Sequence, residues 1–218
     1  MIPFDLVCHM GTLFAILIVF HRKIISLFSK DTQTLLQIII GTLPLFPILI
    51  VLKQIESLYD RPELLGYFFL TTAALLWLGI RFGHNTTAEE KQKHWVRDPL
   101  VIGVFQTLAL LPGVSRSGST ISAARVLGWK MEDSLSFSFL LAIPAILGGT
   151  VLKTLHLYTT SSSLNPDLPF SSYFAGFSTS FLFGVLALKI LIRLAANQKM
   201  VYFVWYCLLI GTGCIFIL

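Results

Sequence analysis

One short segment, Leu111 to Thr120, combines the residue types that bind phosphate. It reads L-P-G-V-S-R-S-G-S-T and lies between two short apolar stretches. Arg116 presents a planar fork of N–H donors that matches the geometry of phosphate oxygens. The segment also opens a predicted short helix, whose first turn carries unpaired N–H groups and the positive end of the helix dipole. The pattern therefore predicts an anion site centred on Arg116.

The residues around the arginine support the same interpretation. Pro112 and Gly113 break the incoming arm, and glycine at position 118 lets the backbone approach a ligand closely. The candidate phosphate-binding residues beside Arg116 are Gly113, Ser115, Ser117, Gly118, Ser119 and Thr120. The alternative is a structural role, in which Arg116 pairs with a carboxylate or with backbone carbonyl groups and fixes the segment in place.

The rest of the chain has the composition of an integral membrane protein. Hydrophobic residues make up 55% of the 218 residues, charged residues 12%, and the mean hydropathy is +0.79. A soluble domain carries roughly 25% charged residues. The apolar blocks are long enough to cross about 30 Å of hydrocarbon, which excludes a soluble domain. The net charge of +5 resides in short loops between these blocks, so no nucleic-acid partner is expected.

The order of the apolar blocks predicts an all-α polytopic fold. We expect six spanning helices, near Pro3–Phe20, Leu35–Leu52, Leu64–Arg81, Ser134–Leu155, Phe170–Leu191 and Val201–Leu218. Between the third and the fourth, the apolar arm Pro99–Leu111 is too short to span, and a second short arm ends near Leu127. Two short arms around a polar tip predict a re-entrant hairpin, which is tolerated at membrane depth only inside protein or beside a cavity. An arginine at such a depth is a candidate functional residue, and we favour phosphate binding.

The distribution of basic residues supports the re-entrant hairpin. If the hairpin enters and leaves on one side, the inside loops hold eleven basic residues: Arg22, Lys23, Lys30, Arg81, Lys91, Lys93, Arg97, Lys130, Lys189, Arg193 and Lys199. The outside loops hold only Lys53, Arg61 and Lys153. A hairpin that crossed the membrane fully would place the last basic loop outside, against the positive-inside rule.

The two halves of the chain resemble each other at an offset of about 133 to 136 residues, which aligns Phe4 with Phe137 and Tyr67 with Tyr202. Three spans per half imply an inverted-topology repeat, which places a ligand site near the membrane midplane. Within one membrane domain, 1–218, we expect a first repeat without its hairpin at 1–82, the re-entrant hairpin at 99–127 and the helices of the second repeat at 134–218. The first repeat should have a hairpin of its own in a further roughly 30–45 residues before Phe4, and the alternative is that the second-half hairpin is an unpaired insertion.

Other polar clusters give weaker signals. Asp5 and His9 lie at positions i and i+4 of the first span and could form a proton-handling pair, although we favour a structural hydrogen bond or an interfacial placement. The five histidines show no spacing typical of a metal site.

The motifs resemble those of the undecaprenyl-diphosphatase (bacitracin-resistance) family. The matching segments are L-P-G-V-S-R-S-G-S-T-I-S-A-A-R at Leu111 to Arg125 and F-S-F-L-L-A-I-P-A-I-L-G-G at Phe137 to Gly149. The G-T-L-P at Gly41 to Pro44 and the F-D-L-V…G-T-L at Phe4 to Leu13 are similar to the first half of that family. The resemblance extends over essentially the whole chain.

The resemblance implies an enzyme that hydrolyses undecaprenyl diphosphate to the monophosphate and thereby recycles the lipid carrier of cell-wall synthesis. It makes Arg116 the phosphate-binding and transition-state residue, in a multi-pass protein of the bacterial plasma membrane. The implied partners are the polyprenyl diphosphate lipid and the bilayer, and a homodimer is left open. No tightly bound cofactor or metal site is implied, with a divalent cation such as Mg²⁺ on the diphosphate left open.

The family joins two hairpin tips, and this chain carries the one with the arginine. The other tip, with a glutamate-rich motif and a P-V-S-S-T-G-H-like stretch, supplies the nucleophile and the acid–base groups. Phosphoryl transfer needs charge stabilisation and a positioned nucleophile. We therefore expect the isolated chain to be inactive or nearly so. The alternative functions are a lipid-phosphate transporter or flippase and a non-catalytic remnant.

Overall fold

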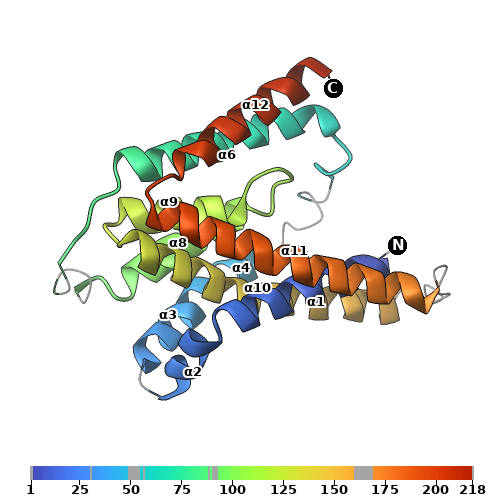
Figure 1. Cartoon of the computed structure of the whole chain (residues 1–218), viewed down its shortest axis with the longest axis horizontal. Coiled ribbons are helices and arrows are strands. Elements are labelled where there is room, and N and C mark those ends of the chain that lie inside the picture. Colours follow the sequence, from blue (N-terminus) through green and yellow to red (C-terminus); the bar gives the residue numbers. More distant parts are fainter. Residues whose placement is uncertain are drawn as a thin grey trace.

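The computed structural model describes residues 2–29, 31–48, 55, 57–87, 89, 93–159 and 169–217. These ranges are helical and contain no strand, which confirms the all-α prediction for this part of the chain. Figure 1 shows α1, α10 and α11 running alongside one another, with α6 and α12 as a separate pair. The elements are α1 (Ile2–Val19), α2 (His21–Ser29), α3 (Thr32–Thr42), α4 (Leu45–Ile48), the 3-10 helix η2 (Pro62–Leu64), α6 (Leu65–Arg81), α8 (Arg97–Leu108), α9 (Arg116–Val126), α10 (Met131–Thr159), α11 (Phe170–Ala196) and α12 (Val201–Ile217).

Several of these helices can cross a membrane. By length and composition the described candidates are Pro62–Arg81, Met131–Leu155 and Phe170–Ala196, and the bent pair formed by α1 and α2 is a fourth if it counts as one span. The predicted spans Leu35–Leu52 and Val201–Leu218 correspond to shorter apolar helices. The structure therefore agrees with a polytopic membrane protein, with α10 and α11 both longer than predicted.

The first predicted span ends in a sharp bend at Phe20. Its axis turns by 70° between α1 and α2. The second helix begins with the polar run His21-Arg-Lys, whereas Ile25 and Phe28 farther along it are 64% and 75% exposed. A short helix with basic and apolar exposed side chains is typical of a segment that lies along a membrane surface.

The second predicted span is interrupted. Its first part, α3, is capped by Asp31, whose carboxylate accepts a hydrogen bond of 3.1 Å from the backbone N–H of Thr34. The helix stops before Pro44, because proline lacks an N–H and disfavours a helical conformation in the residue before it. The helix resumes as α4, and residues 49–52 of the predicted span lie outside the described residues.

Glycines allow the long helices to cross closely. A Cβ atom added to Gly66 of α6 would lie 2.7 Å from the carbonyl oxygen of Gly211 in α12, and one added to Gly211 would lie 2.9 Å from that of Gly66. In the same way, a Cβ on Gly11 of α1 would lie 2.6 Å from the carbonyl oxygen of Phe177 in α11. Small residues at such crossings are typical of helices that pack inside membranes.

The helix ends fall into two groups. In Figure 1 the end of α6, the junction of α9 with α10 and the junction of α11 with α12 lie at the left, whereas the start of α6, the end of α10 and the start of α11 lie at the right. The left end carries Arg81, Arg97, Lys130 and Lys199, which were assigned to the inside loops from the sequence. Lys153, assigned to the outside, lies near the right-hand end of α10.

Candidate active site

The phosphate-binding segment forms the tip of a helical hairpin. Its two arms, α8 and α9, pack against each other, as the two short apolar arms of the sequence predicted. Gly113 has φ of +92°, a conformation that side chains disfavour, and a Cβ there would lie 2.9 Å from Leu65 Cδ1 of α6. Pro112 and Gly113 therefore separate the two arms, as predicted.

The tip is fixed to α6 through Thr72. The backbone N–H of Ser115 donates to Thr72 Oγ1 at 2.9 Å, and the same hydroxyl donates at 3.3 Å to the carbonyl oxygen of Gly113. Ser115 in turn caps α9, because its Oγ accepts a hydrogen bond of 3.1 Å from the N–H of Gly118. This arrangement sets the direction of α9 and places Arg116 at its first turn.

Two neutral groups hold the Arg116 side chain. Its Nε donates to Gln106 Oε1 at 3.0 Å and its Nη2 to the same oxygen at 2.5 Å. Nη2 also donates at 2.8 Å to the carbonyl oxygen of Leu141 in α10. These bonds run through Nε and Nη2, and among the described residues the second amino group, Nη1, has no hydrogen-bond partner. Because both partners are uncharged, they orient the guanidinium without neutralising it.

Gln106 is a site residue that sequence reasoning missed. It is 2% exposed, and its Nε2 is a buried donor without a hydrogen-bond partner in the described part of the chain. An unsatisfied buried N–H group costs about 1–3 kcal/mol, so an additional acceptor at this position would be stabilising. The available signal was a single amide in the otherwise apolar arm Pro99–Leu111.

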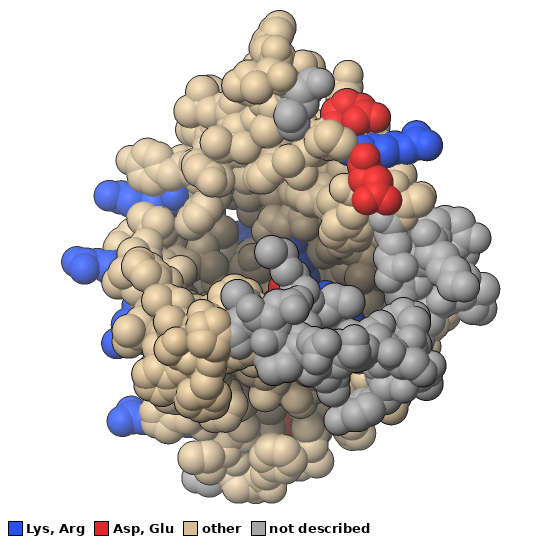
Figure 2. All heavy atoms as spheres, turned by 90° about the vertical axis from the view of Figure 1, so that its right-hand side faces the viewer, with Lys and Arg blue, Asp and Glu red and all other residues tan. Residues whose placement is uncertain are grey.

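Arg116 and Gln106 line a cavity of about 240 Å³. The cavity walls come from α1, α4, α8 and α10 and include Leu6, His9, Leu45, Ala109, Leu110, Ala145, Ile146, Gly149, Thr150 and Lys153. Figure 2 looks at the right-hand end of the molecule and shows a hollow with Lys or Arg atoms in its depth. A mostly apolar cavity with a few polar groups in its lining suits an amphiphile with an anionic headgroup.

Two of the other predicted phosphate ligands, Ser119 and Thr120, make hydrogen bonds within the protein. Ser119 is fully buried, and its Oγ donates at 2.9 Å to the carbonyl oxygen of Ser115. The hydroxyl of Thr120 lies 2.9 Å from the carbonyl oxygen of Arg116 and 2.6 Å from Ser138 Oγ of α10. Of the seven residues predicted for the site, Arg116 lines the cavity, and direct ligation by Gly113, Ser115, Ser117, Gly118, Ser119 and Thr120 remains a prediction.

A polar network lies at the other end of the cavity. The Nδ1 atom of His9 is 2.8 Å from the backbone oxygen of Asp5 and 3.2 Å from its Oδ1. Lys153 Nζ of α10 donates to Asp5 Oδ2 at 3.0 Å. The predicted Asp5–His9 contact is therefore present, and it extends to a lysine that the sequence did not connect with it.

A buried carboxylate fixes the start of the hairpin. Asp98, in the first turn of α8, is 2% exposed and accepts a hydrogen bond of 3.0 Å from Trp129 Nε1. Arg97 donates to its other oxygen through Nε at 3.1 Å and Nη2 at 3.0 Å. This pairing ties α8 to the segment that leads into α10.

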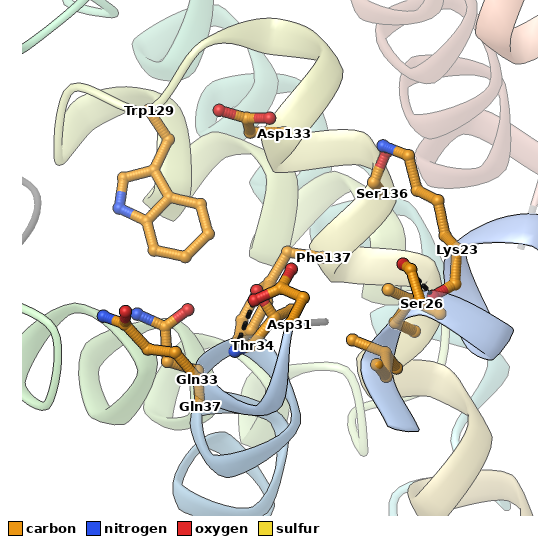
Figure 3. A pocket seen from close by; sticks show the side chains of 12 residues that line it. Lys23, Ser26, Asp31, Gln33, Thr34, Gln37, Trp129, Asp133, Ser136 and Phe137 are labelled. Atoms are coloured by element: carbon orange, nitrogen blue, oxygen red, sulfur yellow. Dashed lines mark hydrogen bonds between the residues drawn. The ribbon is translucent and has the colours of Figure 1, made fainter. Parts of the chain in front are cut away.

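A second cavity, of about 400 Å³, lies at the opposite end of α10. Figure 3 shows its polar lining, in which Lys23 of α2 reaches Ser136 of α10 and donates a hydrogen bond to it, while Asp31 and Gln37 come from the α3 side. This cavity has a lining of mixed charge, with the carboxylates of Asp31 and Asp133 beside Lys23. Among the described residues, the lining of the Arg116 cavity contains cations but no carboxylate. No group of three or more His, Cys, Asp or Glu residues suited to a metal occurs in the described ranges.

The comparison with protein families assigns the chain. The model of the bacitracin resistance protein BacA family matches residues 1–213. The chain belongs to this family. Among curated relatives, the undecaprenyl-diphosphatase of Protochlamydia amoebophila is 47% identical over 95% of this chain and 79% of its own length. Those of Rhodopirellula baltica and Carboxydothermus hydrogenoformans are 36% and 35% identical, over 96% and 95% of this chain and 80% and 79% of their own lengths.

Proposed function

We propose that this BacA-family chain hydrolyses undecaprenyl diphosphate to undecaprenyl phosphate and inorganic phosphate, with the diphosphate bound in the Arg116 cavity. The observation that carries the assignment of the site is the charge of Arg116. Its partners, Gln106 and the Leu141 carbonyl group, are neutral, and a cation in an apolar cavity requires a counter-charge. A lipid diphosphate supplies that charge, and its acceptor oxygens can take the unpaired N–H of Gln106.

The chemistry requires stabilisation of negative charge on the transferred phosphoryl group. A guanidinium that is held in place before the substrate arrives supplies this stabilisation without reorganisation. The N-terminus of α9, at which Arg116 stands, adds a positive dipole end. Hydrolysis breaks the P–O bond of the anhydride bridge and transfers the terminal phosphoryl group to water. Mg²⁺, if required, would enter bound to the diphosphate.

For the architecture we propose the inverted repeat in the bacterial plasma membrane. In this repeat α1 is equivalent to α10, α3 to α11 and α6 to α12. A contact between two helices should therefore recur between their equivalents, so the contact of α1 with α11 predicts one between α10 and α3. Both contacts are present, and the α6–α12 contact maps onto itself. This pattern supports two related halves, and in the proposed arrangement the hairpin lies at their junction.

The test is phosphate release from undecaprenyl diphosphate in detergent micelles by the unchanged chain, Arg116→Ala and the control Arg193→Ala. Arg193 lies exposed on α11. We expect Arg116→Ala to reduce the rate at least about 100-fold, as the loss of a transition-state arginine does elsewhere, and Arg193→Ala to retain it. Equal rates for Arg116→Ala and the unchanged chain would contradict the assignment. If the unchanged chain releases no phosphate, binding of the lipid that is lost in Arg116→Ala would still support the assignment of the site.

One observation favours a second candidate, transport of a lipid phosphate. The two cavities lie at opposite ends of α10, with α3 lining the second cavity and the following helix α4 lining the Arg116 cavity. Between them, Leu141 packs against Gly41, where an added Cβ would lie 3.1 Å from Leu141 Cδ1. A transporter would move labelled polyprenyl phosphate across a sealed vesicle without releasing phosphate, whereas the hydrolase would release phosphate without moving lipid.

A further inference from the structure

We infer that Lys153 forms a second phosphate subsite at the mouth of the Arg116 cavity and makes the site selective for a diphosphate over a monophosphate headgroup. This inference rests on the proposed function, because it assumes that Arg116 binds one phosphate of the substrate. Lys153 and Arg116 line the same cavity and are its only Lys or Arg residues in the described part of the chain.

The position of the two cations along α10 defines the length of the anion. Arg116 is held by the carbonyl group of Leu141, and Lys153 lies twelve residues farther along the helix, about 18 Å along its axis. Because Cα–Cβ bonds in a helix tilt toward its N-terminus, the separation of the two charged groups is expected to be shorter than this axial distance. A single phosphate is too short to contact cations at the two ends of the cavity, whereas two linked phosphates form a longer anion.

The helix face between the two cations leaves room for that anion. Ala145, Ile146, Gly149 and Thr150 line the cavity between Leu141 and Lys153. A Cβ atom added to Gly149 would meet no atom within 4 Å, so this wall is open. The hydroxyl of Thr150 donates to the backbone oxygen of Ile146 at 2.8 Å, so its hydrogen is already used within the helix.

Asp5 and His9 position the lysine. Asp5 Oδ2 accepts from Lys153 Nζ at 3.0 Å, and Asp5 Oδ1 is 3.2 Å from His9 Nδ1, so the carboxylate bridges the two. The ammonium group has three N–H donors, and its bond to Asp5 uses one of them. The stem of the lysine is flexible and about half of its side chain is exposed, so the ammonium can turn toward a ligand while Asp5 keeps it at the mouth.

The subsite has a consequence for turnover. The diphosphate substrate contacts both cations, whereas the lipid monophosphate that remains after hydrolysis has one phosphate and loses one of the two contacts. The product therefore binds less tightly than the substrate, which favours its release.

The experiment compares binding of two non-hydrolysable probes, farnesyl methylenediphosphonate and farnesyl phosphonate, to the purified full chain in detergent micelles by titration calorimetry. The variants are Lys153→Met, which removes the charge and keeps the stem, Lys153→Arg, which keeps the charge, and Lys189→Met, which removes an exposed lysine of α11 outside the cavity. Arg116→Ala reports on the proposed site itself.

We expect Lys153→Met to weaken the diphosphonate about tenfold or more and to leave the monophosphonate unchanged, because one charge-assisted contact is lost from the longer ligand alone. Lys153→Arg should restore the preference, and Lys189→Met should match the unchanged chain. If Arg116→Ala abolishes binding but Lys153→Met weakens both probes equally, or weakens neither, the site stands and the Lys153 subsite is overturned. If Arg116→Ala left both affinities intact, the proposed site itself would be wrong.

Discussion

Replacing Gln106 by glutamate separates the structural role of this residue from its role in phosphate binding. Gln106 Oε1 accepts two hydrogen bonds from Arg116, and its Nε2 is a buried donor aimed at no described partner. A glutamate keeps the acceptor and strengthens the hold on the guanidinium, because it adds the attraction between a carboxylate and a cation to the hydrogen bonds. It removes the donor and cancels the positive charge of Arg116.

The expected loss of affinity follows from these contacts. A hydrogen bond from Nε2 to a charged phosphate is worth about 1.5–3 kcal/mol. A carboxylate about 4 Å from the phosphate adds repulsion of up to about 4 kcal/mol at an effective dielectric constant near 20. Even the lower part of this range, about 3 kcal/mol, reduces affinity for a diphosphate more than about 100-fold.

The assay measures two quantities in the same detergent. Thermal unfolding, followed through tryptophan fluorescence, should give an unchanged or higher Tm for Gln106→Glu without ligand. Calorimetry with a methylenediphosphonate probe should show the loss of binding. The control Gln33→Glu makes the same charge change at an exposed residue in the lining of the second cavity and should bind normally. Tight binding by a well-folded Gln106→Glu would refute the conclusion that Arg116 and Gln106 hold the phosphate.

Two further predictions concern the scaffold. Gly79→Ala in α6 should lower the free energy of unfolding by about 1–3 kcal/mol, because its Cβ would lie 2.7 Å from the Cα of Ser122 in α9. The control Gly148→Ala would meet no atom within 4 Å and should leave thermal unfolding unchanged. Trp129→Phe should lower the free energy of unfolding by about 1–3 kcal/mol, because it removes a hydrogen bond to the buried carboxylate of Asp98 and leaves that oxygen unsatisfied. An unchanged Tm would show that the protein does not need this hydrogen bond.

The sequence was most informative where function depends on local pattern. The arms and the tip of the hairpin followed from two short apolar runs around Pro112 and Gly113, and Arg116 stood out as a charge within that pattern. The break in the second predicted span at Pro44 and the bend after Phe20 had local signals as well, a proline and a run of polar residues. Length and hydropathy alone nevertheless predict continuous spans here, because neither quantity responds to a single proline or a short polar run.

The partners of Arg116 could not be predicted in this way. The carbonyl group of Leu141 lies 25 residues away in the chain, and every residue has a carbonyl group, so no side-chain pattern marks it. The contact between Asp5 and Lys153 spans 148 residues and depends on how α1 packs against α10. Ser119 shows a further point that the sequence does not reveal: its hydroxyl, beside the arginine in a phosphate-binding motif, donates a hydrogen bond to the backbone oxygen of Ser115, and its contact with phosphate stays a prediction.

The most direct test of the account is the position of the phosphorus atoms in an experimental structure with a bound polyprenyl methylenediphosphonate. We expect one phosphonate group within hydrogen-bond distance of the Arg116 guanidinium and of Gln106 Nε2, with the lipid chain leaving along the apolar wall of the same cavity. A diphosphonate bound in the second cavity, beside Lys23 and Ser136, with the Arg116 cavity empty, would contradict it.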